Sequence, residues 1–344
     1  MSTLQIGLAV VGGLVLAGVV AHGAWTSRKN APRQADADAS QEANQEQEPT
    51  FSDSDFSASA MPLPTPLRKP AMDSLIDVIA SLALDPHAGP VSGEAAIAAL
   101  PATRRAGTKP FAVEGFNLQS QHWESPQAGQ RYSSFQAGVQ LANRSGALNE
   151  IEYSEFVVKT QAFCDLIGAT PEFPEMLDEV ARARELDQFA SAHDAQLGFT
   201  IRARNASWSP GYIQQNAARQ GFVAGAIPGR MVLPASSEGL PPVLVLGFDS
   251  QAALADDPAQ SAMREISLHL DVAQVARAEH PFERMRDAAF ALAHDMEGVV
   301  TDDHGQPLAA QTMDVIGSEL EQLSNTLEQR DLAAGTPLAR RLFS

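Results

Sequence analysis

The feature that most limits what this chain can fold into is an uncharged apolar run near its N-terminus. Residues 6–25 contain no Asp, Glu, Lys or Arg. An α-helix of this length spans about 30 Å, the thickness of a bilayer core. The next stretch, "HGAWTSRKN" (22–30), carries the first positive charges, Arg28 and Lys29. Because a secretory signal has its positive charge before the apolar run, this order favours an uncleaved membrane anchor over a cleaved signal or a buried soluble helix.

The positive charges also predict an orientation for this anchor. Lys and Arg residues gather on the cytoplasmic side of membrane helices, and here Arg28, Lys29 and Arg33 follow the apolar run. We therefore expect a short extracytoplasmic N-terminus (1–5), a transmembrane helix (6–25) and a cytoplasmic remainder. The expected localisation is the cell inner membrane, as a single-pass protein.

Residues 26–71, which follow the expected anchor, are too polar to form a core. Their central part, 34–67, holds seven acidic residues, no Lys or Arg, and many Gln, Ala, Ser and Pro residues. Such a composition buries too little apolar surface to offset the entropy of folding, so we expect a disordered linker. The whole chain has a formal net charge of −18, which argues against non-specific binding to nucleic acids.

The rest of the chain is apolar enough to fold. Three parts are expected: a short helical segment (72–106), a binding domain at 107–330 with its core in 195–330, and a flexible tail (331–344). Within the first part, Leu75, Ile79 and Leu82 recur at helical spacing, which predicts a helix over 73–84. A second short helix is expected over 91–100. We expect the two to pack together as a small helical hairpin.

The main domain is expected to be an α+β fold. Ile266, Leu268 and Leu270 alternate with Ser267 and His269, as in a half-buried strand. Strands are expected at 133–143, 195–203, 241–249 and 265–275, with two short strands in 222–235 and one within 299–308. Helices are expected at 150–168, 174–194, 209–221, 281–298 and 309–329. The pattern predicts a largely antiparallel sheet with helices on one face and an open opposite face.

Two stretches of the chain present their expected elements in the same order. Residues 136–187 run strand, turn, Phe-led helix, Gly, Pro and helix, and residues 265–329 run in a similar order. A degenerate internal repeat is one explanation, and chance is another, because element order alone is a weak signal.

The sequence offers little that resembles catalytic or cofactor chemistry. It contains no Gly-rich phosphate loop and no GxSxG, HExxH or CxxC motif. Asp302, Asp303 and His304 could ligate a metal, but their place before Gly305 is more typical of a turn. The single cysteine, Cys164, lies in an apolar helical stripe and is expected to be buried. We therefore expect no enzyme, cofactor or small-molecule substrate.

Several short stretches resemble the ZipA family of bacterial cell-division proteins. The strongest is the collar "HGAWTSRKN", after a very short N-terminus and an apolar helix. Further stretches with the family's element order are "QQNAARQGFV" (214–223), "VLVLGFD" (243–249) and "MEGVVTDD" (296–303). The resemblance implies an inner-membrane adaptor that holds the tubulin-like protein FtsZ by its C-terminal tail. It also implies a split β-α-β domain whose open sheet face carries the binding groove.

The resemblance places the groove on outward residues of the matching strands. These are Thr200, Arg202, Ile227, Val245, Gly247, Ser267 and His269. The family's groove is strongly apolar, whereas Ser267 and His269 are polar here. The affinity would then be weaker, or the tail would bind partly through its acidic residues, at Arg202 and Arg204. The family's short domain also lacks a counterpart of residues 107–194.

Two other readings of the chain remain open from its sequence. A membrane-anchored assembly factor for another envelope complex would show the same anchor, linker and folded part. A membrane enzyme would need to use His269 or the Asp302–His304 cluster, and no nucleophile–base motif accompanies either.

Overall fold

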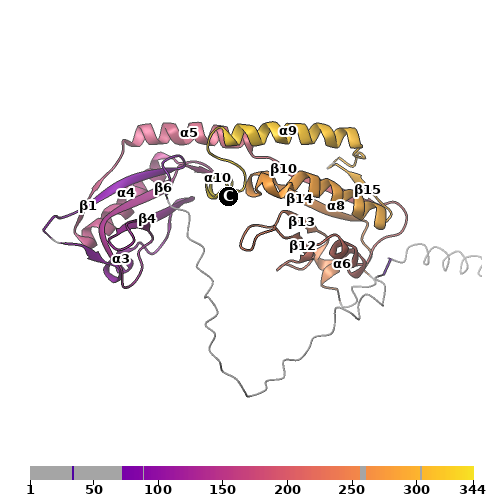
Figure 1. Cartoon of the computed structure of the whole chain (residues 1–344), viewed down its shortest axis with the longest axis horizontal. Helices are drawn as coiled ribbons and strands as arrows, with labels where there is room; N and C mark the ends of the chain where they lie inside the picture. The colour runs from indigo at the N-terminus through magenta and orange to yellow at the C-terminus, as the bar shows by residue number, and fades with distance from the viewer. Residues whose placement is uncertain (1–32, 35–71, 88, 256–260, 303) are drawn as a thin grey trace, which may run out of the picture. The chain divides into compact units, whose positions relative to one another are not determined.

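The computed structural model describes residues 33–34, 72–87, 89–255, 261–302 and 304–344 (Figure 1). These residues form two compact units. Unit 1 contains residues 33–34, 196–271 and 277–321, and unit 2 contains residues 72–195, 272–276 and 322–344. The expected membrane helix and nearly all of the expected linker lie outside the described residues. Among the helices in the described part of the chain, none is long and apolar enough to cross a membrane.

Unit 1 is built on a six-stranded antiparallel sheet. Its strand order is β11-β12-β13-β14-β10-β15. The strands are β10 (Gln196–Ala203), β11 (Val223–Ala224), β12 (Arg230–Leu233), β13 (Leu244–Gly247), β14 (Glu265–Asp271) and β15 (Gly298–Thr301). Phe199 and Ile201 of β10 and Leu268 of β14 are buried, whereas Arg202 and His269 on alternate positions are exposed. The alternation predicted from the sequence is thus confirmed in both strands.

The helices of unit 1 have clear start signals. They are α6 (Pro210–Arg219), α7 (Ser250–Ala253), the 3-10 turn η3 (Arg277–Glu279), α8 (Pro281–Asp295) and α9 (Ala310–Glu328), of which unit 1 contains the part up to residue 321. Ser209 caps α6 by accepting a hydrogen bond from the Tyr212 amide, and Pro210 occupies the first helical position, in the helix predicted over 209–221. Pro281 likewise opens α8, which packs against β10, β14 and β15.

Unit 2 contains a second antiparallel sheet. Its main path is β3-β4-β6-β1-β9, and two short strands pair beside it. The strands are β1 (Asp77–Leu84), β2 (Val91–Ser92), β3 (Arg105–Ala106), β4 (Lys109–Asn117), β5 (Trp123–Glu124), β6 (Arg131–Gln140) and β9 (Ala169–Glu172), with a separate ribbon of β7 (Ala142–Asn143) and β8 (Gly146–Ala147). The α+β class is therefore confirmed, but with two sheets where one was expected.

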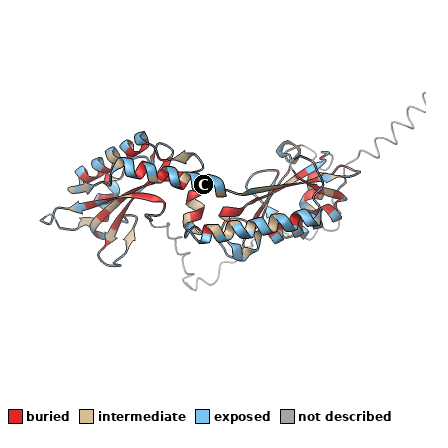
Figure 2. Cartoon of the chain, turned by 90° about the horizontal axis from the view of Figure 1, so that it is seen from above, coloured by how far each residue is buried: buried red, intermediate tan, exposed pale blue. Residues whose placement is uncertain are grey.

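The helices of unit 2 enclose an aromatic core. They are α3 (Gly93–Ala99), α4 (Glu150–Ile167), α5 (Met176–His193), the 3-10 turn η2 (Val272–Gln274) and α10 (Pro337–Leu342). Phe156 and Phe163 of α4 pack on Phe111 of β4 and Phe135 of β6, with ring centroids 6.1 and 5.5 Å apart. Both helices α4 and α5 carry buried residues along one side (Figure 2).

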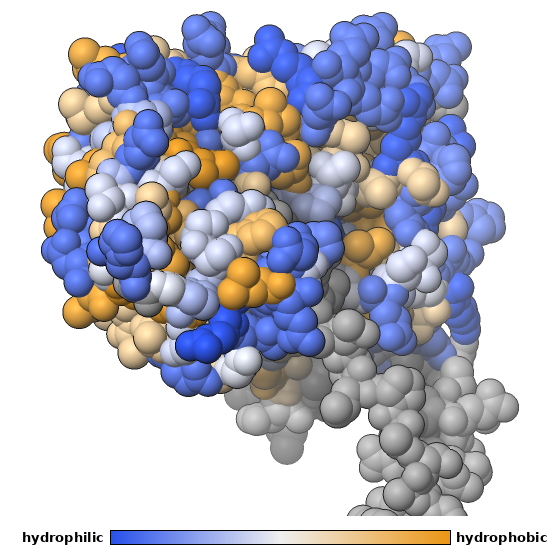
Figure 3. Space-filling model, turned by 60° about the vertical axis from the view of Figure 1, so that its left-hand side comes forward, coloured by the Kyte–Doolittle hydropathy of each residue, from blue (hydrophilic) through white to orange (hydrophobic). Residues whose placement is uncertain are grey.

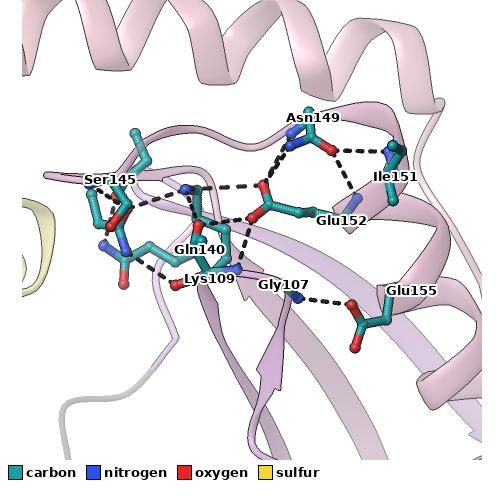
Figure 4. A network of polar contacts seen from close by, with 11 residues as sticks. Gly107, Lys109, Gln140, Ser145, Asn149, Ile151, Glu152 and Glu155 are labelled. Carbon is teal, nitrogen blue, oxygen red and sulfur yellow. Dashed lines mark hydrogen bonds and ion pairs between the residues drawn. The ribbon is translucent and has the colours of Figure 1, made fainter.

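A network of polar contacts ties the start of α4 to β4 (Figure 4). Asn149 and Glu152 form a capping box. The Asn149 side chain accepts a hydrogen bond from the Glu152 amide, and the Glu152 side chain accepts one from the Asn149 amide. Glu152 also accepts 2.8 Å hydrogen bonds from the amide and hydroxyl of Thr108. Its carboxylate lies 3.9 Å from the ammonium of Lys109, which is only 1% exposed. The α4 helix ends at Gly168, whose φ is 68°, as the sequence predicted.

The two units share one topology. In each, a first strand (β10 or β1) lies between the strand before the main helix (β14 or β6) and the strand after it (β15 or β9). Both outer strands run antiparallel to the first, so they are parallel to each other. This is the split β-α-β arrangement. The similar order noticed in the sequence therefore corresponds to two structural repeats, which extend further than predicted, because β1-α3 and β10-α6 also match.

The helix predicted over 73–84 is wrong. Residues 77–84 form strand β1, in the interior of the sheet, paired with both β6 and β9. The sequence fits the period of a helix and also that of a strand. In the structure it follows the strand period, because buried Val78, Ala80 and Leu82 alternate with exposed Ser81 and Ala83. Pairing on two sides outweighs the local helical pattern. The expected helical hairpin is therefore wrong, although the second helix of the pair exists as α3.

The expected boundaries of the folded part also need correction. Residues 72–106 and 107–195 belong to one unit, so the first part is no separate helical segment. The expected flexible tail contains α10, whose Leu342 is buried, as is Phe343 after it. Within the expected linker, the backbone of Arg33 forms an isolated parallel β-bridge with Trp208. The Arg33 guanidinium lies 2.6 Å from the carboxylate of Glu297.

The single cysteine is buried, as predicted. Cys164 lies on the inner side of α4 and is 0% exposed. Burial raises the pKa of its thiol to about 11. The thiol is therefore protonated at neutral pH and contributes to packing.

Glu179 gives unit 2 a testable pH dependence. Its Oε1 accepts a 2.9 Å hydrogen bond from Arg182, but its buried Oε2 has no donor among the described residues. Burial raises the pKa of this carboxyl group. A raised pKa in the folded state stabilises the fold at low pH, and this stabilisation is lost as pH rises through that pKa. We expect Glu179→Gln to gain stability relative to the wild type as the pH rises above the ordinary carboxyl value of 4.5, measured by urea unfolding. Exposed Glu185→Gln on the same helix should show no such trend; an equal trend would contradict the assignment.

Candidate functional site

The open face of the unit 1 sheet carries most of the residues that the sequence placed in a groove. The face turned away from α8 is formed by the outward positions of β10, β12, β13 and β14. Cross-strand pairing aligns Gly247 with Ser267, and Ser267 with Thr200, while Val245 aligns with His269. Six of the seven predicted residues therefore share one face of one sheet. Ile227 is the exception.

The most apolar part of this face is a row across three strands. Val232 of β12 pairs with Val245 of β13, and Val245 pairs with His269 of β14. Val223 of β11, which is 50% exposed, extends the row by pairing with Val232. We define the "valine row" as Val223, Val232 and Val245. The sequence analysis missed Val223 and Val232, although the alternation of "RMVL" (230–233) could have indicated Val232.

A more polar row runs beside the valine row. The Ser267 hydroxyl donates a 3.2 Å hydrogen bond to the carbonyl of Gly247. A Cβ atom at Gly247 would lie 2.9 Å from that hydroxyl, so the glycine leaves room for this contact. The Thr301 hydroxyl donates to the Thr200 carbonyl at 3.3 Å. The hydroxyl of Ser267 is thus turned onto the sheet itself.

Arg202 at the edge of the face already has an acidic partner. It lies opposite Glu265, and its Nε is 3.3 Å from the Glu265 carboxylate. Both side chains are about half exposed, at 48% and 64%. An ion pair in water contributes little free energy, about 0–1 kcal/mol, so Arg202 can exchange its partner for an incoming carboxylate. Arg204 is exposed two residues further along.

The predicted position of Ile227 in a strand is wrong. Ile227 is 55% exposed and lies in the turn between β11 and β12. The amide of Arg230 donates a 3.1 Å hydrogen bond to the Ile227 carbonyl, which closes a turn around Pro228 and Gly229. Gly229 has φ of 76°, the left-handed conformation that a Pro-Gly turn of this kind requires. The turn therefore ends the strand before Ile227.

The Asp302–His304 stretch forms a turn where described. One carboxylate oxygen of Asp302 accepts hydrogen bonds from the amides of His304 and Gln306, at 2.9 and 2.8 Å. Gly305 follows with φ of 80°. Asp303 lies outside the described residues. Among the residues that can be described, no group of three metal-ligating side chains comes together.

Comparison with known protein families identifies one part of the chain. Residues 254–319 match the family described as "ZipA, C-terminal FtsZ-binding domain". No curated protein matches the chain. The matched segment contains β14, α8, β15 and about half of α9, and of the predicted groove residues it includes Ser267 and His269. Over this segment, which lies mainly in unit 1, the chain is therefore similar to the C-terminal domain of ZipA.

Proposed function

We propose that this chain is an adaptor in bacterial cell division that binds the C-terminal tail of FtsZ on the open sheet face of unit 1. The observation that carries the proposal is the match of residues 254–319 to an FtsZ-binding domain. This segment supplies β14, which lies in the interior of the sheet and contributes His269 beside Val245 to the open face. The proposed mode of action is binding, with no catalytic step.

The shape and charge of the face suggest how a peptide would bind. An extended or helical peptide could lay large apolar side chains on the valine row. Acidic side chains of the same peptide could then reach Arg202 at the β10 side of the face. The apolar strip is narrow, so we expect modest affinity at one face. Repeated tails on an FtsZ polymer would raise the effective affinity when several chains are held together.

Membrane attachment is the second part of the proposal. The uncharged run at 6–25 and the positive charges that follow it support a single-pass anchor in the inner membrane, with both units in the cytoplasm. Arg33 pairs with Trp208 of unit 1 and contacts Glu297. Eight Cα–Cα steps lead from position 25 to Arg33, and an extended chain of that length reaches at most about 29 Å. The anchor would therefore hold unit 1 close to the bilayer.

Val245→Glu tests the proposed face. The substitution puts a carboxylate into the valine row, where it would oppose both apolar and acidic parts of a tail peptide. We expect the affinity of unit 1 for a labelled FtsZ C-terminal tail peptide to fall at least about tenfold, measured by fluorescence anisotropy with the full chain. Val245 is half-buried at the surface of the sheet, so circular dichroism should show an unchanged fold.

Ile227→Glu is the matched control for this experiment. It makes the same chemical change at an exposed apolar residue that lies in a turn, away from the strand rows. Binding should remain within about twofold of the wild type. A larger loss of affinity with Ile227→Glu than with Val245→Glu would mean that the peptide binds away from the sheet face. Absence of tail binding by the wild-type chain would overturn the FtsZ role.

A further inference from the structure

The open sheet face of unit 2 has the same place in the fold as the candidate face of unit 1. In unit 1 that face is built from β13, β14 and β10, and the strands with the same place in unit 2 are β4, β6 and β1. Ala112 of β4 pairs with Gly138 of β6, which pairs with Ile79 of β1. These outward residues are small or apolar, whereas unit 1 has His269 in the corresponding strand.

A groove of about 730 Å³ lies on this face of unit 2. Its floor includes Ala112 and Glu114, and its walls come from the loop after α3, from residues 125–126 and from α10. The apolar residues of its lining include Leu100, Pro101, Pro110, Phe111, Val113 and Pro126. Hydrophobic and hydrophilic residues are interspersed over the face that the space-filling view brings forward (Figure 3). The volume lies in the range of sites that bind small ligands or short peptide segments.

Two positive charges at the groove are free to meet a ligand. Arg341 lines the groove but is paired with buried Asp77, whose oxygens lie 2.9 and 2.5 Å from its guanidinium. Glu114 accepts hydrogen bonds from the Met72 amide and the Gln136 side chain. In contrast, the guanidinium groups of Arg104 and Arg340 make no ion pair within the described residues. The groove therefore presents unneutralised positive charge beside an apolar lining, which complements an acidic peptide with large apolar side chains.

Gln140 supplies a third, independent feature of this groove. The residue lines the groove and is 1% exposed. Its Nε2 donates hydrogen bonds to the carbonyls of Ala142 and Arg341, at 2.6 and 2.7 Å, and these two acceptors fix the orientation of the amide. The other amide atom, Oε1, has no donor among the described residues. A buried acceptor without a partner is unfavourable, and a backbone N–H of a bound peptide would satisfy it.

We propose that unit 2 carries a second docking groove, and that its occupant is another FtsZ C-terminal tail. The proposal rests on the proposed function for the identity of the peptide, and on unit 2 alone for the site. Apolar side chains of the tail occupy the lining formed by Leu100, Pro110 and Pro126. Its acidic side chains pair with Arg104 and Arg340. One chain then binds two tails, one on each structural repeat.

Stoichiometry tests this proposal. Isothermal titration calorimetry of the full chain with the FtsZ C-terminal tail peptide should give two sites per chain. Ala112→Glu places a carboxylate on the exposed floor of the groove and should leave one site. Val245→Glu should also leave one site, and the double variant should leave none. Arg104→Glu combined with Arg340→Glu should weaken one of the two sites at least about tenfold.

Each result separates the second groove from the proposed function of unit 1. Ser81→Glu is the control, because Ser81 is exposed on the same sheet face but does not line the groove, and it should keep two sites. One wild-type site that only Val245→Glu removes would overturn the second groove and leave the unit 1 role intact. One site that only Ala112→Glu removes would support the groove and overturn the unit 1 role. Two sites that Ala112→Glu leaves unchanged would also overturn the groove.

Discussion

Glu152→Ala is expected to lower the free energy of unfolding of unit 2 by about 3–5 kcal/mol, the usual cost of leaving a buried charge without its partner. The Lys109 ammonium, 1% exposed, would lose its only ion-pair partner among the described residues, and only the more distant charge of Asp187 would remain. It would keep hydrogen bonds to Thr108 and Asn143, at 2.8 and 3.1 Å, which are neutral acceptors. The Thr108 amide would lose its acceptor as well. Urea unfolding followed by circular dichroism measures the change.

The pH dependence of this variant distinguishes a charge effect from lost packing. Burial lowers the pKa of Lys109, so the unfolded state binds the proton more tightly. Stability linked to this group therefore rises as pH increases between the lowered pKa and the ordinary value of 10.5. Without Glu152 that rise should be steeper, and the destabilisation should shrink towards pH 10. Adding Lys109→Met to Glu152→Ala should restore part of the stability.

Glu155→Gln is the control for the buried pair. Glu155 lies one turn along α4, pairs with Lys159 at 2.7 Å, and its side chain is 42% exposed. An exposed pair contributes about 0–1 kcal/mol, so we expect only a small loss. An equal loss for both substitutions would mean that the burial of Lys109 does not dominate the effect.

The helices could be predicted from the sequence because their ends carry local signals. Ser209 and Pro210 mark the start of α6, and Gly168 marks the end of α4, each within a few residues of the helix. Strand β1 could not be predicted this way. Its residues fit a helical stripe as well as an alternating strand, and the decision lies with β6 and β9, whose pairing partners are distant in sequence.

The candidate face was predictable to the extent that its strands alternate. The pattern of β14 put Ser267 and His269 outward, and the register confirms that they adjoin Val245 and Gly247. Register itself was beyond the sequence, because the alignment of β12 with β13 depends on where the Pro228-Gly229 turn closes. The groove of unit 2 was missed for a similar reason: Arg104, Gln140 and Arg340 meet only in the folded unit.

Trp208→Ala is expected to lower the free energy of unfolding of unit 1 by about 3–5 kcal/mol, as for other large aromatic residues removed from a core. Trp208 is 0% exposed. Its indole Nε1 donates a 2.9 Å hydrogen bond to the carbonyl of Met296, at the end of α8. A Cβ atom at Gly298 would lie 3.3 Å from the Trp208 ring, so the small residue gives the indole its place beside β15. Removing the ring leaves a cavity and an unpaired carbonyl.

Trp208→Phe separates the two contributions. Phenylalanine retains most of the ring volume but cannot donate to Met296, so the loss should be about 1–3 kcal/mol, the cost of an unsatisfied buried acceptor. Trp123→Ala is the control in unit 2, because Trp123 is half-buried on the short strand β5 and contacts Phe116. It should leave the unfolding of unit 1 unchanged.

Because β15 pairs with β10, which carries Thr200 and Arg202, Trp208→Ala should also weaken tail binding at unit 1, in proportion to the unfolded fraction. A loss of tail binding in a fully folded Trp208→Ala chain would show instead that the indole sets the geometry of the face.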